Sequence, residues 1–383
     1  MTIHLHWFLP TTFDSRDIMP AGDNYRRPTI GYLTDVARAA ERNGFEAMLV
    51  PTGTECEDAW LVTAALTQVT DRIKFLVAFR PGFMLPTLAA QMAATYQKIS
   101  NGRLLLNVVT GGDQSEQAAY GDFLEKDARY ERTAEFLEVV RGAWAGRPYS
   151  FTGSHYRVAD GGLVDPLRNP PQIFFGGASA AAEQASARHA DVQLMFGEPP
   201  FMAVERIARL RLLAQQLGRT ITFGIRLHVI TRDTAAAAWA ETDRLLDAMP
   251  VELIERQQAR MARSEAVGQQ RISSLHNGTK DDREALQVYP NLWAGTGLLM
   301  GGGGMALVGS HQEVADRIRE YHSIGIEHFI LSGYPKLEEA YWFGEGVSPL
   351  LEPDRHGDAA PAVSHIGLEV NSGEIAQRVV ATR

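Results

Sequence analysis

Apolar and amphipathic segments alternate along the chain, and this pattern predicts the fold. Eight apolar runs rich in β-branched and aromatic residues predict strands at 3–10, 47–52, 74–80, 103–110, 172–176, 192–196, 221–230 and 327–332. Helical patterns lie between them at 32–42, 86–99, 130–144, 202–217 and 312–323, with Gly44, Gly102, Gly218 and Gly325 as helix stops. Such alternation is typical of a parallel sheet, and eight units predict a TIM (β/α)8 barrel.

Two segments depart from this alternation. Residues 149–158 predict a small hairpin before the fifth strand. Residues 249–308 form a long insertion after the seventh strand, and it contains four consecutive glycines at 301–304. Insertions of this kind are often active-site lids; Trp293 and Met300 favour a docked segment over a linker or an oligomer contact. We expect one barrel domain at 1–350 with a lid at 249–308, followed by a tail at 351–383.

Composition narrows the class of protein. The chain has 383 residues, of which 45% are hydrophobic and 22% charged, as is usual for a globular protein with a large core. The net charge of -9 disfavours nucleic acid and anionic membranes as partners. We expect a cytoplasmic location, because no signal peptide or membrane-spanning run is evident. The single cysteine, Cys56, offers no thiolate cluster, and no metal site is expected.

The strongest functional signal is the strand GIRLHVI at 224–230. Arg226 and His228 are two residues apart, so their side chains point to the same face of an otherwise apolar strand. Burying a cation beside an imidazole is costly, and such pairs mark sites that handle an anion or a proton. The alternative is a strand end where both groups reach solvent or a structural carboxylate. Polar, glycine-rich sequence also follows the other predicted strands, where TIM barrels carry their active sites, so we favour a functional site.

Within such a site, each polar side chain has a candidate role. His228 could be a general acid or base, Arg226 could stabilise an oxyanion, and Tyr334 at the last strand end could donate a proton or hydrogen bond. A second candidate site follows the fifth strand, where Gly176, Gly177, Ala178 and Ser179 precede a helix. Its free N–H groups and capping hydroxyl could hold a phosphate, although an ordinary capped helix explains the residues nearly as well.

The remaining histidines and the cysteine have plainer interpretations. His6 could face the barrel interior, but a core histidine with satisfied hydrogen bonds is the better interpretation. We expect His155, His189, His311 and His322 on surface elements. For Cys56, a small side chain in a polar loop is a better interpretation than a nucleophile, because no activating His or Lys is evident nearby.

Twelve segments taken together carry a family resemblance. They are WFLPT (7–11), PTG (51–53), CEDAWLV (56–62), SNGR (100–103), NVVTG (107–111), FGG (175–177), GEPP (197–200), GIRLHVI (224–230), VGQQR (267–271), LHNG (275–278), NLWAG (291–295) and LSGYP (331–335). This set resembles the alkanesulfonate monooxygenases of the bacterial-luciferase-like superfamily of flavin-dependent monooxygenases. The resemblance covers residues 3–350.

The resemblance implies a barrel with an insertion after the seventh strand and a two-component system. A separate NAD(P)H:FMN reductase would supply reduced FMN (FMNH2), which with O2 would oxygenate a small organosulfur substrate. The products would be an aldehyde, sulfite, FMN and water. We also expect a homo-oligomer, either a dimer or a tetramer.

The same resemblance assigns roles to individual residues. Arg226, His228 and Tyr334 match catalytic positions, and a closed lid would exclude water from the reaction. The cofactor-binding candidates are Asn107, Thr110, Tyr130, Gly177, Ala178 and Ser179, of which Asn107, Tyr130 and Ser179 match positions that hold the flavin and its phosphate. The substrate-binding candidates are Cys56, Phe196 and Met300.

Two departures from the family pattern fall among these substrate residues. Met300 stands where the family has an arginine directly before the lid glycines, and Phe196 stands where it has a tryptophan. An arginine could clamp a sulfonate, whereas a methionine offers only an apolar, polarisable contact. A neutral substrate such as a sulfone is therefore a rival to the sulfonate. Because fold does not fix function, the chain could also be a flavin-binding relative without catalysis or a deazaflavin-dependent reductase.

Overall fold

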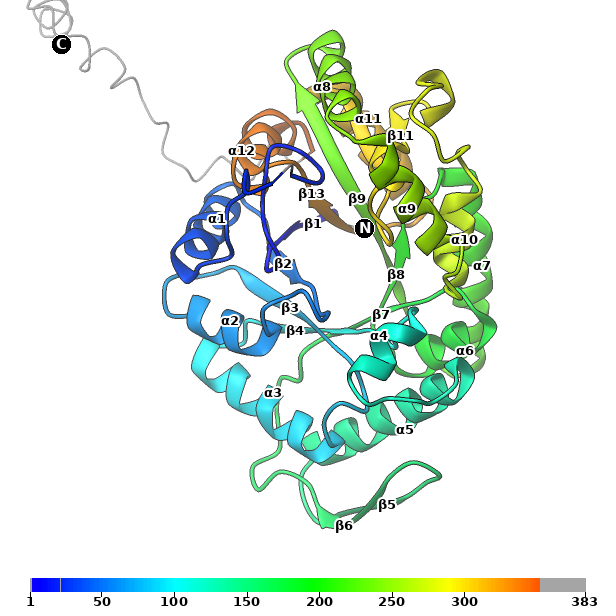
Figure 1. Cartoon of the computed structure of the whole chain (residues 1–383). Coiled ribbons are helices and arrows are strands. Elements are labelled where there is room, and N and C mark those ends of the chain that lie inside the picture. The colour runs from blue at the N-terminus through cyan, green and yellow to red at the C-terminus, as the bar shows by residue number, and fades with distance from the viewer. Residues whose placement is uncertain (1, 21, 352–383) are drawn as a thin grey trace, which may run out of the picture.

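Eight parallel strands close into a barrel in the computed structural model, which describes residues 2–20 and 22–351 (Figure 1). In order around the barrel the strands are β1 (His4–Phe8), β2 (Ala47–Val50), β3 (Lys74–Phe79), β4 (Leu104–Val108), β7 (Ile173–Gly176), β8 (Val192–Phe196), β9 (Thr222–Arg232) and β13 (His328–Ser332). Pairing of β13 with β1 completes the circle. The predicted TIM barrel is confirmed, and each strand lies at its predicted place in the sequence.

Helices between the strands form the outer layer of the barrel (Figure 1). They are α1 (Ile30–Arg42), α2 (Ala59–Leu66), α3 (Pro86–Ser100), α4 (Gln114–Ala119), α5 (Lys126–Trp144), α6 (Ala180–His189), α7 (Pro200–Gln216), α8 (Ala235–Asp247), α11 (His311–Ser323), α12 (Lys336–Gly346) and α13 (Ser348–Leu351). The four predicted glycine stops adopt positive φ angles of 67 to 103°, a conformation that glycine tolerates best.

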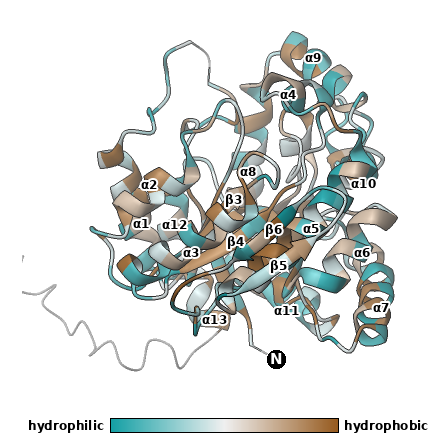
Figure 2. Cartoon of the chain, turned by 90° about the horizontal axis from the view of Figure 1, so that it is seen from below, coloured by the Kyte–Doolittle hydropathy of each residue, from teal (hydrophilic) through white to brown (hydrophobic). Residues whose placement is uncertain are grey.

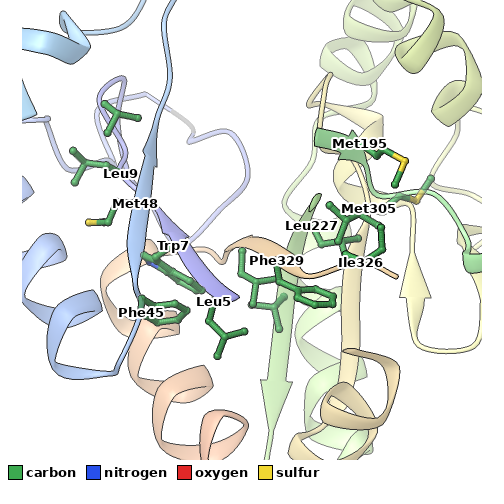
Figure 3. Close-up of a cluster of buried hydrophobic side chains, with 14 of the residues drawn as sticks. Leu5, Trp7, Leu9, Phe45, Met48, Met195, Leu227, Met305, Ile326 and Phe329 are labelled. Carbon is green, nitrogen blue, oxygen red and sulfur yellow. The ribbon is translucent and has the colours of Figure 1, made fainter. Parts of the chain in front are cut away.

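The hydrophobic core has two layers. The larger one lies between strands and helices; Figure 3 shows Trp7 packed beside Phe45, with their ring centroids 4.8 Å apart. The Trp7 indole N–H donates to the backbone carbonyl of Lys336 at 2.9 Å, which fixes the start of α12 against β1. The smaller layer fills the barrel interior and consists of Ala47, Leu49, Leu76, Leu105, Phe174, Val192 and Ile330. Side chains thus fill the barrel near its base, where the strands begin. The space for ligands lies at its upper end, where the strands finish.

Two buried histidines lie at the base of the barrel interior. His6 Nε2 is 3.0 Å from His328 Nδ1, and both rings contact Phe174 edge-on. His6 is therefore a core histidine. The expectation that His189 lies on a surface is wrong: its side chain is 5% exposed, because the end of α6 packs against neighbouring elements.

The predicted hairpin forms from β5 (Tyr149–Thr152) and β6 (Arg157–Gly161), which pair antiparallel outside the barrel.

The insertion contains α9 (Val251–Met261), α10 (Val267–Ser273), η1 (Glu284–Leu286), β10 (Gln287–Tyr289), β11 (Leu292–Trp293), η2 (Gly295–Leu298) and β12 (Ala306–Ser310). β12 pairs parallel with the upper half of β9 and so extends the sheet. Seen from below, the ribbons of α7, α9 and α10 contain many hydrophilic residues, while those of β3 and β4 are largely hydrophobic (Figure 2).

Most of the expected tail at 351–383 lies outside the described residues, and only Leu351 of it is described. In the part of the chain that is described, no helix is both long and apolar enough to cross a membrane.

Candidate active site

The upper ends of β9 and β13 bring Arg226, His228 and Ser332 together. These neighbouring strands run parallel, and their register places Ser332 directly beside His228. Arg226 and His228 project from the same face of β9, as the spacing predicts. Ser332 projects towards them from β13, so three polar groups from two strands meet at the upper end of the barrel.

The hydroxyl of Ser332 joins the arginine to the imidazole. Arg226 Nη2 donates to Ser332 Oγ at 2.8 Å, and Ser332 Oγ lies 2.8 Å from His228 Nδ1. The oxygen accepts from Arg226, and its hydroxyl proton is then free to point to His228 Nδ1. We infer that the neutral imidazole carries its own proton on Nε2 and presents it as a donor.

Aromatic rings line this cluster on two sides. The Arg226 guanidinium lies over the ring of Phe8, 4.7 Å from its centroid. The His228 ring stacks on Tyr334 with 5.1 Å between the ring centroids. Lys336 Nζ lies 4.2 Å from the centroid of the same tyrosine ring. The cations therefore face ring surfaces, which attract them through the ring quadrupole.

Burial sets the protonation states of these groups. It lowers the pKa of His228 well below its usual range, and the charges of Arg226 and Lys336 lower this pKa further. The imidazole is therefore neutral at pH 7. Burial raises the pKa of Tyr334, with Arg226 opposing the rise, so the phenol keeps its proton at neutral pH and can donate a hydrogen bond. Burial lowers the pKa of Arg226 to about 10, which leaves the guanidinium charged at neutral pH.

A buried ion pair between Lys336 and Asp14 lies next to Tyr334. Lys336 Nζ is 3.3 Å from Asp14 Oδ1, and both side chains are buried. Asp14 Oδ2 also accepts hydrogen bonds from the Lys336 backbone N–H at 2.8 Å and from the Tyr32 hydroxyl at 2.6 Å. No sequence pattern pointed to this pair, because its members are 322 positions apart. The lysine directly after the SGYP segment was its only local signal.

Two adjoining cavities lie at the upper end of the barrel. The inner cavity has a volume of about 500 Å³ and the outer one about 840 Å³. Phe8, Met300, Tyr334 and Lys336 line both. The inner cavity is also lined by the sequence-predicted residues Asn107, Thr110, Tyr130, Gly177, Ala178, Ser179, Phe196, Arg226 and His228. The structure therefore gathers all the candidates except Cys56 around one space.

Cys56 lines the outer cavity instead. Its Sγ lies 3.4 Å from Thr12 Oγ1, and the side chain is half-buried. Over residues 2–20 and 22–351, no group of three or more His, Cys, Asp or Glu side chains could hold a metal ion.

Residues 176–179, between β7 and α6, form the cradle that the sequence predicts as a phosphate site. Ser179 caps α6, where its hydroxyl accepts from the backbone N–H of Ala182 at 3.2 Å. Gly177 has a φ of 134°, and a Cβ there would lie 3.0 Å from the Tyr130 hydroxyl. A Cβ on Gly176 would enter open space. A side chain at Gly177 would collide with Ala182 and Tyr130, whereas Gly176 leaves the space beside the turn open.

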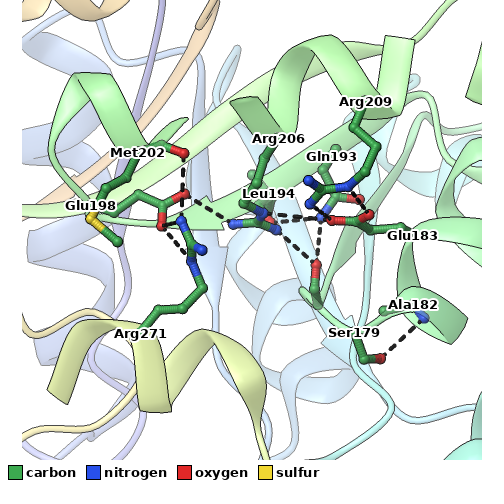
Figure 4. A network of polar contacts seen from close by, with 11 residues as sticks. Ser179, Ala182, Glu183, Gln193, Leu194, Glu198, Met202, Arg206, Arg209 and Arg271 are labelled. Atoms are coloured by element: carbon green, nitrogen blue, oxygen red, sulfur yellow. Dashed lines mark hydrogen bonds and ion pairs between the residues drawn. The ribbon is translucent and has the colours of Figure 1, made fainter. Parts of the chain in front are cut away.

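A chain of ion pairs connects this cradle to the insertion (Figure 4). Arg206 on α7 donates to the Gly177 carbonyl at 3.1 Å and to Glu198 Oε1 at 3.2 Å. Glu198 in turn accepts from Arg271 on α10 at 2.7 and 2.9 Å. Glu198 is 2% exposed, so this network is shielded from solvent on the barrel side. No sequence pattern predicts this network, although the segments GEPP and VGQQR contain Glu198 and Arg271.

The insertion lies over the inner cavity. The Gly302 N–H donates to Gln269 Oε1 on α10 at 2.7 Å. A Cβ on Gly303 would lie 3.2 Å from Arg226 Cγ, so the glycine run passes directly over the arginine. Lys126 on α5 also holds the insertion, through the Glu265 carbonyl at 2.9 Å. In the described conformation the insertion therefore covers Arg226.

Comparisons with known proteins agree with this architecture. Residues 3–328 match the family described as luciferase-like monooxygenase. A riboflavin lyase, solved with modified FMN and riboflavin, shares the fold with a TM-score of 0.75 and 20% identity, over 93% of this chain and 92% of that chain. The EDTA monooxygenase from Chelativorans sp. BNC1 has a TM-score of 0.73 and 20% identity, over 92% of this chain and 94% of that chain. A long-chain alkane monooxygenase has a TM-score of 0.73 and 19% identity, over 93% of this chain and 92% of that chain.

Proposed function

The chain belongs to the luciferase-like monooxygenase family, and we propose that it is an FMNH2-dependent monooxygenase acting on an alkanesulfonate or a related organosulfur compound. A separate NAD(P)H:FMN reductase would supply the reduced flavin. In the proposed reaction, an alkanesulfonate, O2 and FMNH2 give an aldehyde, sulfite, FMN and water. One oxygen atom of O2 enters the aldehyde and the other leaves in water, while FMNH2 provides the two electrons.

The observation that carries the proposal is the arrangement of the inner cavity. Gly177 and Ser179 form a phosphate cradle at one end, while Arg226, His228 and Tyr334 stand at the other. The volume of about 500 Å³ accommodates a flavin-sized ligand. Asn107 and Thr110 also line this cavity and can hydrogen-bond a ring edge.

Each polar side chain has a role that follows from its charge state. Arg226 binds a negative group with the N–H groups that Ser332 and the backbone carbonyls leave available. His228, neutral and protonated on Nε2, donates a hydrogen bond to negative charge on the reacting groups. Tyr334, protonated and beside His228, is a proton donor for a leaving oxygen. Ser332 positions the first two.

The insertion excludes water from this space. Met300 and the glycines at 301–303 line the inner cavity from above, and Arg271 holds α10 to the barrel through Glu198. Water exclusion strengthens every charged interaction inside and protects reactive species from hydrolysis. We propose that the insertion opens for ligand entry and closes for reaction.

Substrate identity is the finer part of the proposal. The solved relatives are named for riboflavin, EDTA and a long-chain alkane, which share no common reacting group. Support for an anionic organosulfur substrate comes from the resemblance and from the cationic end of the cavity at Arg226. A neutral sulfone is the second candidate, because Met300 and Phe196 give the lid side of the cavity an apolar surface.

Anaerobic binding followed by oxygen addition tests the proposal. We expect FMNH2 to bind more tightly than oxidised FMN, and more tightly than a reduced deazaflavin cofactor. The bound FMNH2 should then consume one O2 per sulfite released when an alkanesulfonate is present. Tighter binding of the deazaflavin would indicate a reductase instead. Bound FMNH2 that yields only hydrogen peroxide with every sulfonate and sulfone would indicate a non-catalytic relative.

A further inference from the structure

The inner cavity is lined by cationic side chains and by no carboxylate within the described residues. Lys126 and Arg206 lie towards the phosphate cradle, and Arg226 and Lys336 towards the opposite end. At the first end Arg206 is paired with Glu198, and Lys126 donates to a backbone carbonyl. A flavin phosphate would supply the negative charge there. The opposite end needs a separate explanation.

At that opposite end two cations share one carboxylate. The hydrogen bonds of Arg226 go to neutral groups, namely the carbonyls of Leu227 and Ile330 and the hydroxyl of Ser332. Lys336 is paired with Asp14, whose side chain is fully buried. One positive charge therefore remains in excess. An uncompensated buried charge is costly, so the end of the cavity is suited to an anion.

Asp14 is held away from the cavity by its other partners. Its two oxygens accept from the backbone N–H groups of Ser15 and Lys336 at 3.0 and 2.8 Å, and from the Tyr32 hydroxyl at 2.6 Å. Asp14 lines neither cavity, whereas Lys336 lines both. The lysine thus has the carboxylate on one side and the ligand space on the other.

Lys336 stands where the two cavities meet. Its ammonium lies over Tyr334, which stacks on His228, and Tyr334 also lines both cavities. Burial lowers the pKa of Lys336, and Asp14 opposes this, so the pair holds a charge next to the reacting groups. A ligand that extends from the inner to the outer cavity would pass this ammonium.

We propose that Lys336 is a substrate-binding residue that holds the anionic head group of the substrate together with Arg226, and so selects a sulfonate over a neutral sulfone. This inference rests on the proposed function and names the substrate class. In this arrangement Met300 contributes an apolar contact from the lid, and Lys336 contributes the second cation from the barrel. The ammonium donors that Asp14 leaves available and the remaining N–H groups of Arg226 can together satisfy the three oxygens of a sulfonate.

The test compares two ligands of similar shape, 1-octanesulfonate and methyl octyl sulfone, in which a methyl group replaces one charged sulfonate oxygen. Each is titrated anaerobically by calorimetry into the protein with and without FMNH2. The variants are Lys336→Gln, Lys336→Arg and the control Lys74→Gln. The control removes an exposed lysine at the start of β3, at the base of the barrel and away from the cavities. We expect Lys336→Gln to weaken sulfonate binding roughly 10- to 100-fold and to leave sulfone binding within about twofold. Lys336→Arg should recover most of the loss, and Lys74→Gln should bind as the parent does.

A second variant keeps the test decisive if the first one does not fold. If Lys336→Gln does not fold, the double variant Asp14→Asn with Lys336→Met removes both charges and leaves neither buried alone. It should bind the sulfone and lose the preference for the sulfonate. Equal weakening of both ligands would show a merely structural ion pair and overturn the proposal, as would unchanged sulfonate binding.

The same titrations separate this inference from the proposed function. If FMNH2 does not bind to the parent protein, the monooxygenase proposal fails, yet sulfonate binding to the flavin-free protein still reports on Lys336. If the parent binds no sulfonate in either state, the inference fails, whether or not FMNH2 binds.

Discussion

The hydroxyl of Ser332 lies 2.8 Å from Nδ1 of His228 and accepts a hydrogen bond from Arg226 through the same oxygen. A single oxygen therefore fixes the orientation of the imidazole and of the guanidinium. Because β9 and β13 hold the three residues in register, the arrangement depends on strand pairing rather than on a flexible loop. Sites built on strands keep their geometry better than sites built on loops.

Ser332→Ala should therefore disturb the reaction more than it disturbs cofactor binding. Without the hydroxyl, His228 loses the partner that sets its tautomer. We expect kcat/KM to fall roughly 10- to 100-fold, while the Kd of FMNH2 changes by less than about twofold. Steady-state kinetics with anaerobic flavin titration checks both.

Ser186→Ala is the matched control for that variant, because its buried hydroxyl has no hydrogen-bond partner among the described residues. Equal loss of activity in the two variants would remove the role given to Ser332.

Met300→Arg should raise activity on short alkanesulfonates. Met300 lines both cavities from the lid, so an arginine there can reach an anionic head group on closure. We expect kcat/KM for ethanesulfonate to rise by roughly tenfold. Met300→Leu, which stays apolar, should leave the preference among chain lengths as it is. A substrate profile of Met300→Arg identical to that of the parent would contradict a lid contact.

Arg271→Gln should weaken closure without affecting the barrel. The change removes two hydrogen bonds that tie α10 to Glu198, while Glu198 keeps its pair with Arg206. We expect a larger share of O2 to end as hydrogen peroxide, and faster proteolysis within 249–308. Peroxide assay and timed protease digestion measure these effects. The exposed Arg256 of α9 provides the control, Arg256→Gln; matching behaviour of the two variants would argue against a tether at Arg271.

His189 should make the fold sensitive to acid. Burial lowers its pKa to about 4, and the charges of Arg141, Arg188 and Arg219 add to this effect. Between pH 6.5 and 4 the unfolded chain takes up a proton that the folded one does not, so stability falls as pH falls through this window. The loss from this residue reaches about 3 kcal/mol. Urea unfolding at several pH values should show a shallower decline for His189→Gln. Parallel declines in parent and variant would refute this.

The barrel was predictable from sequence because its strands are buried on both faces and appear as continuous apolar runs. Arg226 and His228 were predictable for a related reason: two polar residues at spacing two interrupt one of these runs. The secondary structure of the insertion was not predictable, because β12 forms by pairing with the upper half of β9 rather than through its own sequence pattern. Local sequence carries little information about such distant pairing.

The Lys336 and Asp14 pair was unpredictable for the same physical reason. Each residue is ordinary in its local sequence, Lys336 at the start of a helix and Asp14 in a loop, and only closure of the barrel between β13 and β1 brings them together. His189 was predicted to lie on a surface element, because a histidine near a helix end is usually exposed. It is buried because α6 packs closely on its neighbours.

The proposed reaction is tested most directly by the release of sulfite and aldehyde from a panel of alkanesulfonates, supplied with FMN, an NAD(P)H-dependent flavin reductase, NADH and O2. We expect sulfite and aldehyde in equal amounts, well above a control without the protein, and their loss in Arg226→Ala. Tight binding of FMNH2 without sulfite from any member of the panel would contradict it.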